Sequence, residues 1–230
     1  MSDILNQFVN YSGGAYGADT LGDIIGREYG FNNHTHFRPY DNPNVSMSLQ
    51  KRGVSGFLLT KQQTNDARMA VNVALNKNYK NNVAGNLQGR NYFQVLNADA
   101  VYCFSRKIDS NTISGGTNTA FQLAIKTEKL LWLFDIEELV WYKYNTFNEC
   151  LERCPVPYLQ KAYAIVGSRD IENYKVKSNI GWIDRPAYIG DIRSQRVKDA
   201  IENLYIETIK HYKANLYGIH ENTEITKGFI

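Results

Sequence analysis

The sequence predicts an α/β fold, in which a Rossmann-like, doubly wound and mostly parallel sheet carries helices on both faces. Apolar strands alternate with amphipathic helices along the chain, and this alternation is typical of a parallel sheet. Three turns of small residues, YSGGAYGAD, ISGGTNT and AIVGSRD, adjoin apolar strands and precede helices. The 230 residues suit one domain, with residues 1–145 as its core and residues 146–230 completing it with a strand and a long helix.

The individual elements follow from hydrophobic spacing and turn residues. Strands are expected over 7–11, 34–40, 99–105, 130–136, 139–145 and 162–170, and helices over 20–30, 64–80, 90–98, 120–129 and 191–213. Residues 41–60 and 81–89 are rich in polar and turn-forming residues, which indicates a long loop or lid and a polar bridge. Thr64 or Asn65 is expected to cap the helix after the first of these segments. The tail after Gly218 is polar and is expected to be loose.

Composition and charge argue against several classes of function. The net charge of +3 is small, whereas nucleic-acid-binding domains usually carry a clear basic stripe, so a nucleic-acid partner is not expected. No apolar run is long enough to span a membrane and the N-terminus lacks the blocks of a signal peptide, so we expect a cytoplasmic protein without a membrane partner. An odd number of cysteines supports reduced thiols. Cys150 and Cys154 would share a helix face, but no second ligand pair follows, so neither a metal nor a cofactor is expected.

Two of the glycine turns, over 12–19 and 114–119, have the composition of anion-binding sites. Glycine lets backbone N–H groups approach a ligand, and the N-terminus of the following helix supplies unpaired donors and a partial positive charge. Ser12, Thr117 and Thr119 add hydroxyl groups. Neither turn matches a Walker motif or GxGxxG, so a dinucleotide redox cofactor is not expected. The alternative is that these glycines serve only tight packing.

The glycine turns and their surroundings resemble the SLOG superfamily, a group of Rossmann-like nucleotide-binding proteins that includes the Smf/DprA and LOG proteins. SGGAYGAD is similar to the first glycine signature of that group, and GRNYFQVLNADAVYCF with SGGTNTAFQLAIKTEKLLWLFDI is similar to its second half. The likeness covers Phe8–Asp135 and is closest to members named as molybdenum-cofactor carriers and to phage-borne relatives. It implies a Rossmann-like fold, a nucleotide-derived ligand and a homo-oligomer, either a dimer or a larger assembly.

The third turn differs from the pattern of many SLOG members in its position. In those members a strand ending in GSR comes first, whereas AIVGSRD comes last here, so the resemblance implies a circular permutation. We therefore expect residues 162–168 to pair beside the strand at 8–11. Gly167, Ser168 and Arg169 would then complete the same pocket as the other two turns.

LOG-type members cleave the bond between a base and ribose 5′-phosphate, and the resemblance implies an Arg and a Glu as their working residues. Arg90 occupies the Arg position, whereas Gln122 occupies the Glu position and Asn118 replaces the central glycine of the signature. A neutral amide neither stabilises a positively charged ribose nor serves as a general base. Hydrolysis of the LOG type is therefore not expected.

Other acids and histidines offer alternative catalytic groups. Asp19 is expected to cap its helix or to contact a ribose hydroxyl, and Asp99 is expected to order the loop beside its strand. His34 and His36 lie on the same side of a strand. They would contact a ligand or a metal, unless they are exposed polar residues on an edge strand.

The sequence thus favours non-catalytic binding of a small phosphate-bearing ligand derived from a nucleotide. The resemblance implies a signalling nucleotide, such as an ADP-ribose derivative or a cyclic nucleotide, which a phage protein would sequester in the host cytoplasm against host defence. The alternatives are a nucleotide hydrolase and a single-stranded-DNA-binding protein. Gly14→Val is expected to abolish binding while leaving the protein folded. The expected ligand-binding residues are Ser12, Gly13, Gly14, Ala15, Gly17, Asp19, Arg90, Asn91, Gly115, Gly116, Thr117, Asn118, Thr119, Gly167, Ser168 and Arg169.

Overall fold

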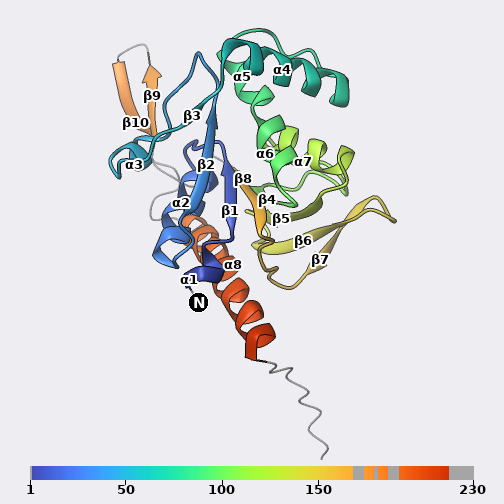
Figure 1. Ribbon diagram of the computed structural model, residues 1–230. Helices are drawn as coiled ribbons and strands as arrows, with labels where there is room; N and C mark the ends of the chain where they lie inside the picture. Colours follow the sequence, from blue (N-terminus) through green and yellow to red (C-terminus); the bar gives the residue numbers. More distant parts are fainter. Residues whose placement is uncertain (1, 168–173, 179–180, 186–191, 218–230) are drawn as a thin grey trace, which may run out of the picture.

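The computed structural model describes residues 2–167, 174–178, 181–185 and 192–217, and within them eight strands form one mixed sheet (Figure 1). The strands are β1 (Val9–Ser12), β2 (Asn33–Arg38), β3 (Phe57–Leu58), β4 (Ala100–Ser105), β5 (Leu130–Asp135), β6 (Val140–Asn145), β7 (Cys150–Cys154) and β8 (Ala162–Gly167). Their order is β3-β2-β1-β8-β4-β5-β6-β7. The first six in this order are parallel, and β6 and β7 pair antiparallel at one edge. The predicted Rossmann-like α/β fold is therefore confirmed.

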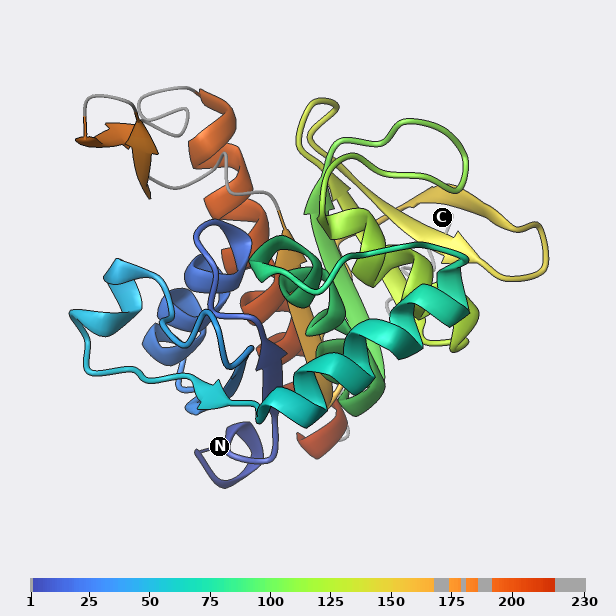
Figure 2. The same ribbon diagram turned by 90° about the horizontal axis from the view of Figure 1, so that it is seen from above.

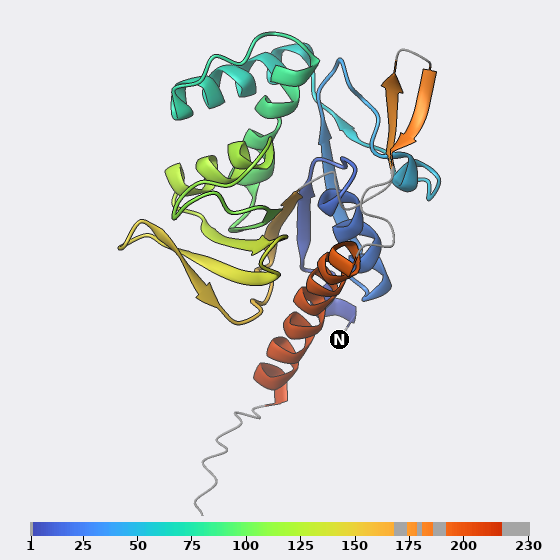
Figure 3. The same ribbon diagram turned by 180° about the vertical axis from the view of Figure 1, so that it is seen from behind.

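Helices cover both faces of the sheet, as Figures 2 and 3 show. The helices are α1 (Ser2–Leu5), α2 (Ala18–Glu28), α3 (Met47–Gln50), α4 (Lys61–Leu75), α5 (Val83–Gly89), α6 (Asn91–Asn97), α7 (Thr117–Lys126) and α8 (Ile192–Tyr217). Buried side chains of α2 and α8 join one hydrophobic cluster, and those of α4, α6 and α7 join a second cluster on the opposite face. The strands between them are buried on both sides, which explains their continuous apolar runs.

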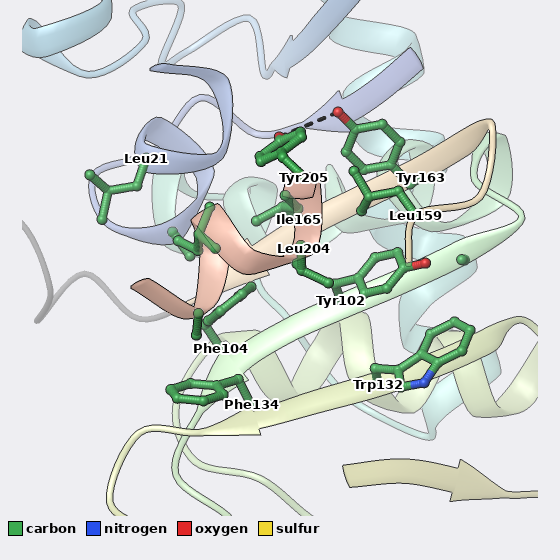
Figure 4. Packing of buried hydrophobic residues seen from close by; sticks show 14 of the residues in the cluster. Leu21, Tyr102, Phe104, Trp132, Phe134, Leu159, Tyr163, Ile165, Leu204 and Tyr205 are labelled. Carbon is green, nitrogen blue, oxygen red and sulfur yellow. Dashed lines mark hydrogen bonds between the residues drawn. The ribbon is translucent and has the colours of Figure 1, made fainter. Parts of the chain in front are cut away.

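The face beneath α8 is built around aromatic side chains, which Figure 4 shows from close by. The Tyr205 hydroxyl donates to the backbone oxygen of Gly22 over 2.6 Å and lies 3.3 Å from the Tyr163 hydroxyl. A Cβ at Gly22 would lie 3.1 Å from Ile165, and one at Gly26 would lie 2.7 Å from the Tyr205 hydroxyl oxygen. These two helical glycines let α2 pack closely against β8 and α8, which offsets their low helix propensity.

The last strand of the large sheet lies at its centre. β8 pairs parallel with β1, where Val9 is opposite Ala162, and with β4, where Ala100 is opposite Tyr163. The predicted pairing of this strand beside the N-terminal strand is therefore confirmed for its described residues, 162–167, while residue 168 lies outside them. Its apolar run, Ala162–Gly167, is buried along most of its length because helices cover both faces there.

Several local expectations are wrong. Residues 41–60 are not wholly irregular, since they contain α3 and β3. The polar bridge at 81–89 contains α5, which Asn82 caps through a hydrogen bond from the Gly85 N–H. The N-cap of α4 is Thr60, which forms a reciprocal capping box with Gln63 and lies four residues before Thr64, the first of the two expected caps.

Further differences concern the second half of the chain. The CLERC segment at 150–154 is strand β7 and not a helix, so its two cysteines do not share a helix face. Strands β9 (Tyr174–Ser178) and β10 (Gly181–Arg185) form a separate antiparallel pair that the sequence analysis does not predict. The polar tail at 218–230 lies outside the described residues. Within the described part of the chain, no helix combines the length and the hydrophobicity needed to cross a membrane.

Candidate functional site

A cavity of about 420 Å³ opens at the carboxyl ends of the central strands. Its volume lies in the range of small-molecule sites, and carboxyl ends of parallel strands are where doubly wound sheets usually bind ligands. The cavity lies between the first glycine turn, the ends of β4 and β8, the helices α5 and α6, and the start of α7. Its lining residues are Ala15, Asp19, Leu87, Gln88, Arg90, Asn91, Gln94, Ser105, Ser114, Gly115, Gly116, Thr117, Ala120, Val166 and Gly167.

Asp19 joins the first glycine turn to the end of β8. Its Oδ2 accepts a hydrogen bond from the backbone N–H of Gly13 over 3.0 Å, and its Oδ1 accepts one from the N–H of Gly167 over 3.3 Å. The expectation that Asp19 caps its own helix is wrong, because α2 has Gly17 as its N-cap and no side-chain cap. Ser168 and Arg169, which follow Gly167, lie outside the described residues.

Arg90 supports the same turn from the other side. Its Nη1 donates to the backbone oxygen of Gly13, and its Nη2 lies 3.8 Å from Asp19 Oδ2. The Arg90 side chain is 8% exposed, so this charge pair is largely shielded from water. A Cβ at Gly13 would overlap the Arg90 guanidinium, which gives Gly13 a physical reason to be glycine. Arg90 therefore places a positive charge in the cavity wall while it also holds the turn.

The start of α7 is the best candidate for binding an anion. Gly115, Gly116 and Thr117 line the cavity, and the N-cap Gly116 makes no side-chain hydrogen bond to the helix. The side chains of Ser46, Thr60 and Asn82 cap α3, α4 and α5, whereas α2 and α6, like α7, have no side-chain cap. A helix N-terminus without a side-chain cap leaves backbone donors and the positive end of the helix dipole for another partner. At α7 the N–H groups of Asn118 and Thr119 donate to the Gly115 and Gly116 oxygens, and the residues before them, Gly115 to Thr117, line the cavity.

Gln94 is an unusual member of the lining. It is fully buried on α6, and neither its Oε1 nor its Nε2 has a hydrogen-bond partner within the described part of the chain. A buried polar group without a partner costs about 1–3 kcal/mol, and such groups are rare in folded proteins. Asn91, also buried, lies one helical turn earlier in the same wall. Two amide side chains of α6 thus contribute to one cavity.

A second cavity of about 320 Å³ lies behind the 115–119 turn. Gln88, Gly115 and Gly116 line both cavities, so they form the wall between them. The Thr119 hydroxyl fixes this wall, because it donates to Gln88 Oε1 over 2.7 Å and lies 2.8 Å from the Tyr79 hydroxyl. The amide of Gln88 therefore packs over Gly116, where the missing Cβ leaves room.

Gln122, at the position of the LOG-type glutamate, borders this second cavity and does not line the first. Its Nε2 donates to the backbone oxygen of Asn111 over 2.8 Å and lies 3.5 Å from Asn118 Oδ1. Asn118 in turn accepts a hydrogen bond from the Ile113 N–H. Both side chains thus bind the loop before α7 to its first turns.

The expected site residues divide into three groups. Those that line the first cavity are Ala15, Asp19, Arg90, Asn91, Gly115, Gly116, Thr117 and Gly167. Those that belong to the turns but not to its lining are Ser12, Gly13, Gly14, Gly17, Asn118 and Thr119. Ser12, for example, accepts a hydrogen bond from the Gly14 N–H and so stabilises its own turn. Ser168 and Arg169 form the third group, which the structure does not describe.

Several lining residues are not predicted from the sequence. They are Leu87, Gln88, Gln94, Ser105, Ser114, Ala120 and Val166. Leu87 and Gln88 belong to α5, which the sequence analysis treats as a polar bridge. The placement of Gln94 beside Arg90 was predictable from the sequence, because residues four apart lie on the same face of a helix.

The segment at 41–60 packs against the outside of the first glycine turn. The Ser46 N–H donates to the Gly14 oxygen over 2.8 Å, and a Cβ at Gly14 would lie 2.7 Å from Val45 Cγ1. Gly14 also has φ +56°, which favours glycine. Gly14→Val would therefore strain the backbone and displace Val45. This geometry predicts that the variant is less stable than the wild type, so a loss of binding would not by itself identify Gly14 as a ligand contact.

The two histidines are not exposed residues, because both side chains are buried beneath α2 with Asp23. His36 Nε2 and Arg27 Nε donate to the Asp23 carboxylate. Burial by itself would raise the pKa of Asp23, but the hydrogen bonds from His36 and Arg27 outweigh burial and hold that pKa well below its usual value. The cluster is thus a buried ion-pair network that ties α2 to β2.

His34 is held as a neutral ring. The Asn10 Oδ1 accepts from the Ile165 N–H, so the Asn10 Nδ2 faces His34 Nδ1 at 3.3 Å, while His34 Nε2 lies 2.7 Å from the Phe31 oxygen. Nδ1 therefore accepts and Nε2 donates, which is the pattern of a neutral imidazole. Burial lowers the pKa of His34 to about 4, and the Asp23 charge opposes it only in part.

The remaining alternative groups lie outside the cavity. Asp99 is exposed just before the first residue of β4, whereas Ser105, at the other end of this strand, lines the cavity. Six strand residues span about 20 Å, so Asp99 is at the wrong edge of the sheet for this site. Cys103, Cys150 and Cys154 are free thiols, and no cluster of three or more metal-ligating side chains occurs among the described residues.

Comparison with known proteins adds no identification. No protein-family model, no curated protein and no solved structure matches the chain. What the protein binds is therefore inferred from the geometry and chemistry of the cavity.

Proposed function

We propose that the protein binds a small phosphate-bearing ligand derived from a nucleotide and does not turn it over. The observation that carries this proposal is the N-terminus of α7, which has no side-chain cap and opens through Gly115, Gly116 and Thr117 into the cavity. Backbone donors at such a helix end suit the oxygens of a phosphate. Arg90 adds a positive charge to the same cavity.

The other lining groups suit the rest of a nucleotide. Asp19 is an acceptor for ribose hydroxyls, since each of its oxygens has lone pairs beyond the one hydrogen bond it accepts from Gly13 or Gly167. Asn91 and Gln94 supply amide groups. The resemblance to the SLOG superfamily supports the same class of ligand. We extend the proposal to a signalling nucleotide, held by a phage protein against host defence, on that resemblance alone.

The absence of turnover rests on Gln122. Its amide is bonded to Asn111 behind the glycine turn, so the position of the LOG-type glutamate carries no carboxylate and does not line the cavity. One observation favours hydrolysis as the second candidate function, because Asp19 places a carboxylate in the cavity wall. Both oxygens of that carboxylate already accept backbone N–H bonds, from Gly13 and Gly167, which give Asp19 a structural role in the turn.

The proposal is tested by mixing the protein with 5′-mononucleotides, ADP-ribose derivatives and cyclic di- and trinucleotides. Free ligand is removed, the protein is denatured, and the released compound is identified by chromatography and mass. We expect a compound to be released intact. A cleaved compound would favour the hydrolase, and release of nothing from the whole panel would contradict both.

The matched pair of variants is Gly116→Ala and Thr60→Ala. The methyl group of Gly116→Ala would lie 2.8 Å from Gln88 Nε2, so it displaces the end of the flexible Gln88 side chain in the wall that both cavities share. We expect binding of the released compound to weaken at least tenfold, or about 1.4 kcal/mol. Thr60→Ala removes the cap of α4 instead and should leave that affinity unchanged.

A further inference from the structure

We infer that Gln94 recognises the edge of a nucleobase, so that the ligand carries a hydrogen-bond donor and an acceptor side by side. This inference rests on the proposed function and specifies the part of the ligand that a phosphate site leaves open. It begins from the burial of Gln94, whose two amide atoms lack partners within the described residues although the side chain is fully buried.

Gln94 belongs to the wall of the cavity, and its amide is covered in the absence of a ligand. α6 packs against the strands β1 and β8 and against the helices α4, α5 and α7. Val95, the next residue, enters the hydrophobic cluster on this face. Gln94 lines the cavity instead, and a group placed in the cavity is the available partner for its amide.

The chemistry of an amide restricts what that partner is. Oε1 accepts and Nε2 donates, and the two atoms lie side by side in one plane. The complementary surface is therefore a planar edge with an adjacent donor and acceptor. Nucleobases have such edges, and a Gln amide pairing with adenine through two hydrogen bonds is a recurrent example. A ligand that is only a sugar phosphate would leave the amide unpaired.

The cavity places this amide together with the proposed phosphate site. Gln94 and Asn91 are on α6, the phosphate donors are at the start of α7, and the two helices pack against each other. Asp19 lies in the same lining. One nucleotide would thus use the α7 N-terminus for its phosphate, Asp19 for its ribose and Gln94 for its base.

The experiment compares the wild-type protein with Gln94→Leu, which keeps the size of the side chain and removes both amide atoms. The probes are AMP, GMP, CMP, UMP, ADP-ribose and ribose 5-phosphate, and the dissociation constants are measured by calorimetry. The matched control is Gln62→Leu, at an exposed glutamine of α4 whose amide donates to Asp66. Melting temperatures of all three proteins are measured without ligand.

We expect Gln94→Leu to weaken binding of the tightest nucleotide by at least about tenfold, while the affinity for ribose 5-phosphate stays within twofold. Its melting temperature should be equal to or above that of the wild type, because an unpaired polar group is replaced by an apolar one. Gln62→Leu should change neither affinity.

Two results would overturn the inference and leave the proposed function in place. One is a nucleotide affinity unchanged in Gln94→Leu, and the other is an equal loss for the nucleotide and for ribose 5-phosphate. A lower melting temperature with unchanged nucleotide affinity would assign Gln94 to the core instead. If the wild type binds neither these six probes nor the cyclic di- and trinucleotides, the proposed function fails and the inference fails with it.

Discussion

Asp19 Oδ1 accepts a hydrogen bond from the backbone N–H of Gly167, a residue 148 positions further along the chain. The other oxygen of the same carboxylate accepts from Gly13 in the first glycine turn. One side chain therefore holds together two strand ends from opposite parts of the sequence. The site exists because β8 returns between β1 and β4 and brings Gly167 within reach of Asp19.

Asp19→Asn should destabilise the protein by about 1–3 kcal/mol, because the new amide NH2 group would face a buried backbone N–H and leave it without an acceptor. The free energy of unfolding, measured with urea, checks this. Asp99→Asn is the control at an exposed acid before β4 and should change stability by at most about 0.5 kcal/mol. Equal stabilities of Asp19→Asn and wild type would mean that the link to Gly167 contributes nothing.

Gly14→Val should lower the free energy of unfolding by at least about 2 kcal/mol, through a strained φ and an overlap with Val45. Gly116→Ala should cost about 1 kcal/mol or less, since φ is negative there and the neighbouring Gln88 amide can move. Urea denaturation of both variants measures the difference. Similar stabilities would show that the segment at 41–60 does not restrict the first turn.

Stability should fall as the pH is lowered from about 6.5 to about 4, because of His34. In this range the unfolded chain binds a proton on His34 that the folded protein excludes, since burial lowers the folded pKa to about 4. Stability from this group is fully present above pH 6.5. The loss amounts to about 3 kcal/mol, at about 1.4 kcal/mol per pH unit.

Urea unfolding of His34→Gln at pH 7, 5.5 and 4.5 tests this dependence on pH. The variant should lose much less stability than wild type over the same interval, because Gln does not titrate. His211→Gln on α8 keeps His34 and should therefore follow the wild type. Parallel losses in wild type and His34→Gln would assign the acid sensitivity to other groups. Below pH 4 the protonation of Asp23, whose folded pKa is also lowered, should add a further loss.

Gln122→Glu should not create a nucleotide hydrolase, although it restores the residue type of the LOG pattern. The side chain at 122 borders the second cavity, and the change also removes the donor to the Asn111 oxygen. Release of a free base from AMP, followed by chromatography, is the measurement. Base release by Gln122→Glu but not by wild type would show that the two cavities act as one site.

Much of this architecture is predictable from local sequence. The continuous apolar runs at 100–105 and 130–135 and the helical spacing within 64–75 specify elements whose burial depends little on distant details. The glycine turns at 12–19 and 114–119 likewise identify the parts of the chain that form the carboxyl edge. Segments of mixed polarity are harder to predict, since α5 has a strong cap at Asn82 but few apolar side chains.

The role of individual polar residues is decided by tertiary structure. Asp19 has the sequence context of a helix cap, yet its partners come from a neighbouring turn and from β8. His34 and His36 have the alternation of an exposed strand, yet α2 buries them beside Asp23. A hydrogen-bonding group selects its partner by proximity in space, and that proximity depends on strand order.

The amino-acid sequence by itself determined the α/β class, the principal strands and helices, and the glycine turns of the site, because hydrophobic period and backbone freedom are local properties. Only the tertiary structure decided that Gln94 lines the first cavity and that Gln122 borders the second. It also decided that Asp19 links the first glycine turn to the end of β8. Helical spacing puts Gln94 on the same face as Arg90, but which face of α6 meets the cavity, and where Gln122 and Asp19 lie, depends on how α6, α7 and β8 pack around one another.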